Sequence, residues 1–175
     1  MSEVMVVMYS YAGTSRQLAQ LLCSQQEWPM AEISEVSPRS GLRGTGRCLL
    51  DSWLRRRPEI RYTGPPPNEF DAVVLVAPIW AYRLAGPMRS FVALWREHLP
   101  DVAVVSVMGG SGAPNAVAEI GQLLGRSPIL STAFTSREVE DGSCAAWLQA
   151  FGNAVEKAQD TRAVVRPAIC SPQAV

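Results

Sequence analysis

The sequence predicts an α/β fold: a three-layer, doubly wound domain around a five-stranded parallel sheet of strand order 2-1-3-4-5. Three apolar runs, over 4–8, 72–79 and 102–108, are short, continuous and rich in valine, as is typical of strands buried on both faces of a parallel sheet. Segments with helical periodicity separate the strands, so strands and helices alternate five times along the chain. Right-handed crossovers between such strands place helices on both faces of the sheet.

Two further strands are expected at the edges of this sheet. Polar and apolar residues alternate over 32–36, and the stretch 129–135, which follows Pro128, mixes serine and threonine with apolar residues. Both patterns are typical of strands that have one face in solvent. These two strands complete the predicted set of five.

The helices are expected between the strands and after the last one. The first begins near Ser15, where leucines recur at helical spacing and where Thr14 and Gln17 have the spacing of a capping box. Pro87 suits the first residue of the third helix, and Gly125 suits the C-terminal cap of the fourth. The second to fifth helices are predicted over 49–57, 87–99, 113–124 and 147–155.

The chain has the composition of one globular domain. Its 175 residues are 47% hydrophobic and 18% charged, which provides enough apolar surface for a continuous core. We expect this domain to span residues 1–160. Residues 161–175 contain two prolines and little periodicity, and we expect them to form a C-terminal tail.

Charge, hydropathy and cysteine usage exclude several classes of function. Sixteen basic and sixteen acidic residues cancel, which argues against a nucleic-acid partner. No apolar run approaches the roughly 18 residues needed to cross a bilayer, and the N-terminus lacks the pattern of a signal peptide. We therefore expect a cytoplasmic protein without a membrane partner. Cys23, Cys48, Cys144 and Cys170 show no metal-binding spacing, and they are expected to be reduced thiols.

A small, hydroxylated turn follows the first apolar strand and leads directly into the first helix. Its backbone N–H groups and hydroxyls can converge on a phosphate dianion beside the positive end of the helix dipole. No basic side chain is strictly required for such a site. The turn consists of Ser10, Tyr11, Ala12, Gly13, Thr14 and Ser15.

Two more turns are expected at the same edge of the sheet. In the order 2-1-3-4-5, the strands that end at Tyr9 and Ala77 are neighbours, and a ligand crevice opens outside their carboxyl ends. The turn after the central strand offers aromatic side chains that suit a planar ligand. Glycines after the next strand let the backbone approach such a ligand closely. The residues of these two turns are Pro78, Ile79, Trp80, Ala81 and Tyr82, and Gly109, Gly110 and Ser111.

The quoted turns resemble those of the flavodoxin family. Residues 10–15 are similar to its phosphate loop, which has a serine or threonine, a variable pair, glycine, any residue, and serine or threonine. Residues 77–91 are similar to the family segment that runs from a central strand through the flavin loop into the next helix. The likeness covers roughly residues 3–158. It implies that residues 1–160 form a flavodoxin-like domain that binds flavin mononucleotide (FMN) without a covalent link at the three turns named above.

The resemblance also implies a redox function. Electron transfer and flavin-dependent reduction of a small acceptor such as a quinone both occur on this fold, the second as an FMN-dependent NAD(P)H oxidoreductase. The expected partners are a redox protein or a small-molecule acceptor, and family members occur both as monomers and as homo-oligomers, so a homodimer stays open. The balanced charge of this chain differs from the acidic character typical of electron-carrier flavodoxins.

Other proteins with this strand order lack support in the residues. A receiver domain needs an aspartate where this chain has Ala77 and Pro78, and a small tyrosine phosphatase needs a cysteine in the first loop. A dinucleotide-binding domain expects G-x-G-x-x-G where only Gly13 occurs. One alternative stays open: a flavin-free, flavodoxin-like scaffold that acts as a protein-interaction module.

Overall fold

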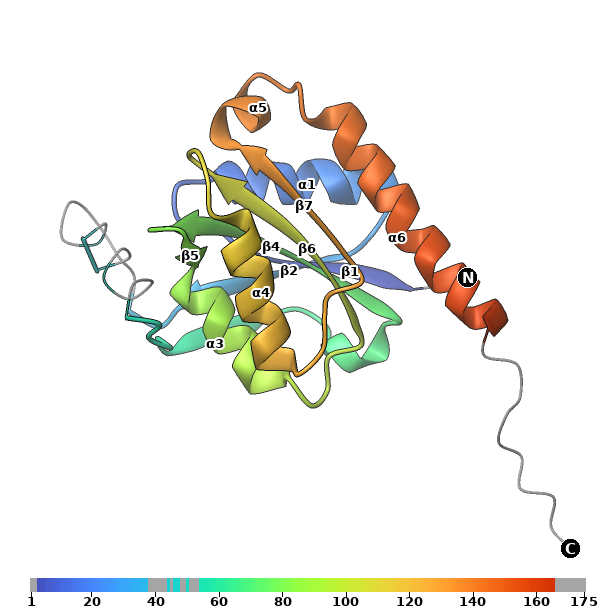
Figure 1. The fold of residues 1–175 in the computed structure, drawn as a ribbon, viewed down its shortest axis with the longest axis horizontal. Coiled ribbons are helices and arrows are strands. Elements are labelled where there is room, and N and C mark those ends of the chain that lie inside the picture. Colours follow the sequence, from blue (N-terminus) through green and yellow to red (C-terminus); the bar gives the residue numbers. More distant parts are fainter. Residues whose placement is uncertain (1–2, 38–43, 45, 48–49, 51–53, 166–175) are drawn as a thin grey trace, which may run out of the picture.

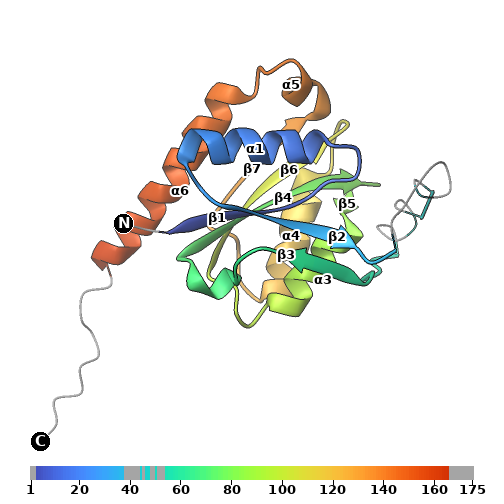
Figure 2. The ribbon, with the colours of Figure 1, turned by 180° about the vertical axis from the view of Figure 1, so that it is seen from behind.

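The structure is a computed structural model that describes the chain except for residues 1–2, 38–43, 45, 48–49, 51–53 and 166–175. A central sheet lies between two helical layers, with α1, α5 and α6 on one face and α3 and α4 on the other (Figure 1; Figure 2). The strands are β1 (Val4–Tyr9), β2 (Met30–Glu35), β3 (Ile60–Thr63), β4 (Ala72–Trp80), β5 (Arg83–Leu84), β6 (Asp101–Met108) and β7 (Leu130–Thr135). The helices are α1 (Thr14–Gln26), α3 (Gly86–Trp95), α4 (Ala113–Leu124), α5 (Ser136–Glu140), α6 (Ala145–Val165) and a 3-10 turn over Pro67–Glu69.

The sheet is mostly parallel. Within the described residues it has seven strands, in the order β3-β2-β1-β4-β6-β7, with β5 paired to β4 alone. The neighbouring strands β2, β1, β4, β6 and β7 are all parallel to one another. By contrast, β3 runs antiparallel to β2, and β5 runs antiparallel to β4. Because β1, β4, β6 and β7 share one direction, the loops that follow them lie at one edge of the sheet.

The sheet differs from the sequence prediction in its strand count and at one edge. The prediction of five strands was wrong because β3 and β5 add to them, and the prediction that 32–36 forms an edge strand was wrong because β3 covers that side of β2. The sequence of β3 is only four residues long, and its residues alternate between half-buried and exposed. The two residues of β5 depend on a tight turn rather than on a pattern of their own.

The core has two parts, one on each face of the sheet. Successive residues of β1 contribute to them in alternation, as the pleat of a strand requires. Met5 and Val7 pack in the cluster that α3 and α4 cover. Val6 and Met8 pack in the cluster that α1 and α6 cover. Both faces of the central strands are therefore buried, as their continuous apolar sequences predict.

Of the nine positions of the predicted second helix, 49 and 51–53 lie outside the described residues, and residues 54–57 form a turn and an irregular segment instead of a helix. Of its apolar positions, 49 and 53 are not described, while Leu50 and Leu54 are 44% and 47% exposed and therefore form no buried stripe. The predicted cap at Gly125 is confirmed, because this glycine, with φ 71°, caps α4, whereas α3 begins at Gly86, one residue before the predicted Pro87. The helix α6 continues to Val165, into the range predicted as a tail.

Two described cysteines have free thiols. Cys144 is buried and Cys23 half-buried, and burial raises the pKa of Cys23 to about 11. At neutral pH Cys23 is therefore a thiol rather than a nucleophilic thiolate. Cys48 and Cys170 lie outside the described residues. None of the described helices combines the length and the apolar character that spanning a bilayer requires.

Candidate functional site

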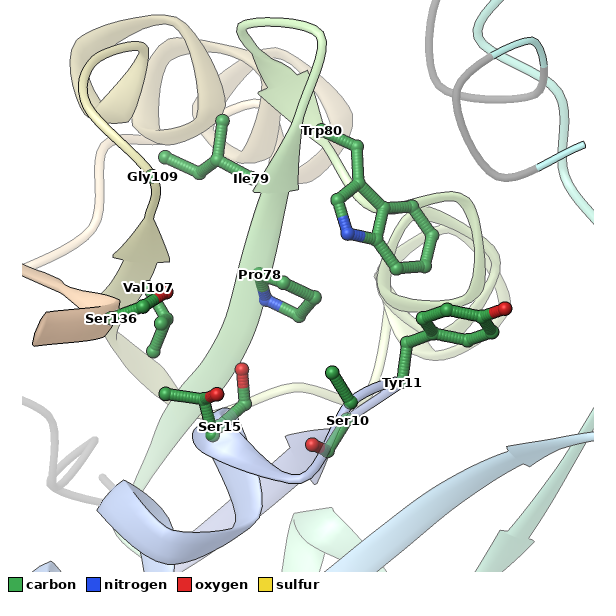
Figure 3. A pocket seen from close by; sticks show the side chains of 11 residues that line it. Ser10, Tyr11, Ser15, Pro78, Ile79, Trp80, Val107, Gly109 and Ser136 are labelled. Carbon is green, nitrogen blue, oxygen red and sulfur yellow. The ribbon is translucent and has the colours of Figure 1, made fainter. Parts of the chain in front are cut away.

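A cavity of about 180 Å³ opens at the edge of the sheet where β1, β4, β6 and β7 end. We call it the hydroxyl cavity, because serine and threonine form much of its polar lining. Figure 3 shows Trp80 and Tyr11 on one side of it and Ser15 and Ser136 on the other. Its lining residues are Ser10, Tyr11, Ala12, Thr14, Ser15, Pro78, Ile79, Trp80, Val107, Gly109 and Ser136.

Gly13 joins the first loop to helix α1. Its φ of 99° lies in the left-handed region that favours glycine, and its carbonyl accepts a hydrogen bond from the Gln17 N–H at 3.0 Å. The Gly13 N–H in turn donates to the Ser10 Oγ at 3.0 Å. A Cβ at Gly13 would meet no atom within 4 Å, so the backbone conformation rather than crowding calls for glycine here. Gly13 itself does not line the cavity.

The start of α1 carries no side-chain cap. The predicted capping box between Thr14 and Gln17 was wrong, because Gly13 occupies the N-cap position and cannot supply a side-chain oxygen. The first N–H groups of a helix have no hydrogen-bond partner within the helix, and at the start of α1 no capping side chain accepts a hydrogen bond from them. Ser15, only 2% exposed, lies in this first turn. Together with the helix dipole, these donors favour an anion at the cavity.

The lining of the hydroxyl cavity carries no charged side chain. Arg16, in the first turn of α1, pairs with Glu32 of β2. Its charge is therefore directed to a carboxylate rather than to the cavity. Any anion bound here would be held by backbone N–H groups, hydroxyls and the helix dipole.

An aromatic cluster forms one wall of the cavity. The ring of Trp80, at the end of β4, meets Tyr9 edge to face at 5.7 Å between ring centroids and Tyr11 at 5.8 Å. The Tyr9 hydroxyl donates to Glu35 Oε1 at 2.7 Å. Edge-to-face packing of this kind fixes the orientation of the indole. Trp80 is therefore anchored as a wall of the cavity by its contacts with Tyr9 and Tyr11.

The turn after Trp80 is strained. Trp80 pairs with Arg83 across a two-residue hairpin, and the residues between them, Ala81 and Tyr82, have φ of 49° and 62°. Such turns normally contain asparagine or glycine at these positions. Ala81 and Tyr82 do not line the hydroxyl cavity, and Tyr82 is 64% exposed. Backbone strain of this kind occurs preferentially at functional sites.

The third loop contributes less than the sequence suggests. Gly109 lines the cavity, whereas Gly110 and Ser111 are exposed and do not. The glycine that the fold requires is Gly112, with φ 113°, where a Cβ would lie 2.8 Å from the Tyr82 Cα. Gly112 therefore permits close approach of the β4–β5 turn to the start of α4.

Sequence reasoning missed two lining residues, Val107 and Ser136. Ser136 begins α5, and a capping box between Thr135 and Glu138 fixes this helix at the end of β7. Hydrogen bonds from the Thr135 N–H and hydroxyl lower the pKa of Glu138. The sequence contained a signal for Ser136, because this residue directly follows the predicted strand 129–135, whose end must lie at the same edge of the sheet as the other loops.

No protein-family model and no curated protein matches the chain. Solved structures do resemble it. A flavoprotein from Lactobacillus acidophilus in complex with FMN has a TM-score of 0.67 and 19% identity, over 82% of this chain and 99% of that chain. A putative flavoprotein from Bacteroides eggerthii has a TM-score of 0.65 and 17% identity, over 86% of this chain and 98% of that chain. A WrbA-like flavodoxin from Agrobacterium tumefaciens has a TM-score of 0.53 and 13% identity, over 92% of this chain and 99% of that chain. The chain therefore has a flavodoxin-like fold, as the loop resemblance predicts.

Proposed function

We propose that the chain binds FMN without a covalent link at the hydroxyl cavity and acts as a flavin-dependent redox protein. The observation that carries this proposal is the pairing of an uncapped helix start with an anchored aromatic wall across one cavity. The first suits a phosphate and the second a planar ring. The likeness to a flavoprotein that was solved with FMN supports the same assignment.

The residues present fit the phosphate end of FMN. Ser10, Thr14 and Ser15 would supply hydroxyls, and the first turn of α1 would supply N–H groups. A lining without carboxylates adds no repulsion to a dianion. Ser136 would add a hydroxyl from the side of the cavity on which Ser15 lies, opposite Trp80 (Figure 3).

The ring of FMN would lie beside Trp80. The cavity, at about 180 Å³, is smaller than the roughly 300–1,000 Å³ of pockets that enclose a whole cofactor or drug-sized ligand. It would therefore enclose the phosphate end and leave the ring at its mouth, against the aromatic side chains.

The flavin itself supplies the electron-transfer chemistry when it is bound. The chain's own task is to bind the phosphate, hold the aromatic wall in place and set access to the site. Reduction of a small acceptor such as a quinone needs no acid or base from the hydroxyl cavity, whose lining has no titrating carboxylate or imidazole. We propose such a reduction in preference to a carrier role because the chain carries no net charge.

The direct test is the visible absorption spectrum of the purified protein, before and after incubation with FMN and removal of unbound nucleotide. We expect a flavin spectrum shifted from that of free FMN. A protein that stays colourless after incubation would contradict the proposal and would favour the flavin-free scaffold.

Gly13→Val tests the phosphate loop. Valine at a φ of 99° is strained by about 1–3 kcal/mol, so the turn must shift and the donors at the start of α1 lose their placement. We expect retention of FMN to be lost while circular dichroism still shows a folded protein. Gly110→Val is the matched control, because Gly110 is exposed near the same edge, lies outside the cavity and has no positive φ. Undiminished FMN retention in Gly13→Val would count against this loop.

A further inference from the structure

A second cavity lies on the other side of the β4–β5 turn. It measures about 590 Å³ and is bounded by that turn, by Arg55 and by one face of α4. We call it the arginine cavity. Its larger lining side chains are those of Arg55, Tyr82, Arg83, Asn115, Glu119 and Gln122.

The arginine cavity has a net positive lining. Arg55 and Arg83 form no ion pair with any residue that the structure describes. Glu119 is the one acidic residue in the lining, and it forms an ion pair with Arg89 of α3, which does not line the cavity. Arg89 and Glu119 are 2% and 7% exposed, so this pair is buried beneath the cavity surface. The carboxylate is therefore compensated, while the two lining arginines are not.

The lining also provides neutral donors. Asn115 and Gln122 project their amides from exposed positions of α4. A guanidinium offers two parallel N–H donors, which match the paired oxygens of a carboxylate or phosphate. The side chains around the cavity thus suit an anion of this chemistry.

The two cavities are neighbours along the chain. Ile79 and Trp80 line the hydroxyl cavity, and Ala81, Tyr82 and Arg83 line the arginine cavity. The strained turn is thus the wall between them, and the approach of Tyr82 to Gly112 seats it against the start of α4. A molecule in the arginine cavity would lie next to the residues that we assign to the flavin ring.

We propose that the arginine cavity binds the small redox substrate of the flavin site, and that this substrate carries a phosphate or carboxylate group. The part of this inference that makes the bound molecule a substrate rests on the proposed function. The binding of the anion itself depends only on the residues of the arginine cavity and is tested separately.

The test is isothermal titration calorimetry of the full chain loaded with FMN, at low salt. NADP⁺ probes phosphate recognition, and 1,4-naphthoquinone-2-carboxylate probes carboxylate recognition. The methyl ester of the naphthoquinone is the uncharged counterpart. We expect at least one anionic probe to bind, the ester to bind more weakly, and added salt to weaken the anionic probe because charges near the surface are screened.

Arg83→Gln and Arg55→Gln remove one cation each. Loss of a charge-assisted hydrogen bond should weaken the anionic probe by about tenfold while leaving the ester unchanged. Arg57→Gln is the matched control, because Arg57 is an exposed arginine two residues from Arg55 that does not line the cavity. We expect it to bind the probe as the wild type does.

Three results would overturn the inference: neither anionic probe binds, the ester binds as well as the carboxylate, or Arg57→Gln has the same effect as Arg83→Gln. The flavin spectrum of the same samples reports on the proposed function independently. If FMN fails to bind, the titration is repeated on the flavin-free chain, where the same arginine dependence still supports an anion site and its absence rejects one.

Discussion

The hydroxyl cavity and the arginine cavity share one turn, yet each suits an anion by different means. The first has no charged lining residue and offers hydroxyls and an uncapped helix start. The second has two arginines without an acidic partner among the described residues. Dipoles fixed by the backbone depend on chain geometry, whereas side-chain charges depend on residue identity and on salt. A backbone change should therefore impair the first cavity and a charge change the second.

The buried pair of Arg89 and Glu119 connects the two cavities. Arg89 donates to the carbonyls of Leu84 in β5 and Arg56, each at 2.9 Å, in addition to its ion pair with Glu119. It thereby ties together α3, α4, the β4–β5 hairpin and the segment before β3. Since the strained turn separates the cavities, we expect both of them to lose their shape when this guanidinium is removed.

The largest effect is therefore expected from Arg89→Met. Removing one partner of a buried ion pair costs about 3–5 kcal/mol, because Glu119 is left buried without compensation. We expect the free energy of unfolding, measured by urea denaturation, to fall by this amount and both FMN and anion binding to weaken. Arg96→Met is the control, because Arg96 pairs with Glu97 at the surface, where both side chains are exposed. Equal stabilities of the two variants would show that the pair does not hold the turn.

The sequence was sufficient for the features that depend on local pattern. The valine-rich runs predicted β1, β4 and β6, and the placement of the first loop before α1 follows from the leucines after Ser15. It also predicted that the loop after β1 and the residues at the end of β4 would meet. Residues from both segments line the hydroxyl cavity. These features need only strand burial, helical spacing and the shared direction of parallel strands.

The remaining features depend on contacts between distant residues. Arg89 stands in an apolar stretch of α3, and nothing near it in sequence identifies Glu119, thirty positions later, as its partner. The two strained residues after Trp80 are alanine and tyrosine, whereas glycine or asparagine would have indicated such a turn. Tyr82 was therefore predicted on the same side as Trp80. The structure places it at the other cavity instead.

Trp80→Ala and Tyr82→Ala compare the two sides of the turn directly. Trp80 lines the hydroxyl cavity and Tyr82 the arginine cavity. If stacking on the flavin resembles stacking on a base, Trp80→Ala weakens FMN binding by about 1–3 kcal/mol. We expect Tyr82→Ala to change it by less than about 0.5 kcal/mol, as for an ordinary surface position. Fluorescence titration with FMN measures both, and the reverse ranking would place the ring on the arginine side of the turn.

The smallest effect concerns Glu138, which caps α5 and so helps to position Ser136 in the hydroxyl cavity. Its pKa in the folded protein lies below the ordinary 4.5, because Thr135 donates hydrogen bonds to the charged carboxylate. The folded state therefore gains stability from this group above pH 4.5, and this gain is lost as the pH falls through the lowered pKa. Glu138→Gln keeps a capping side chain but removes the charge. We expect a slightly lower melting temperature than wild type at neutral pH and a difference that disappears in acid. A difference that stays constant with pH would show that the charge of Glu138 contributes nothing to the cap.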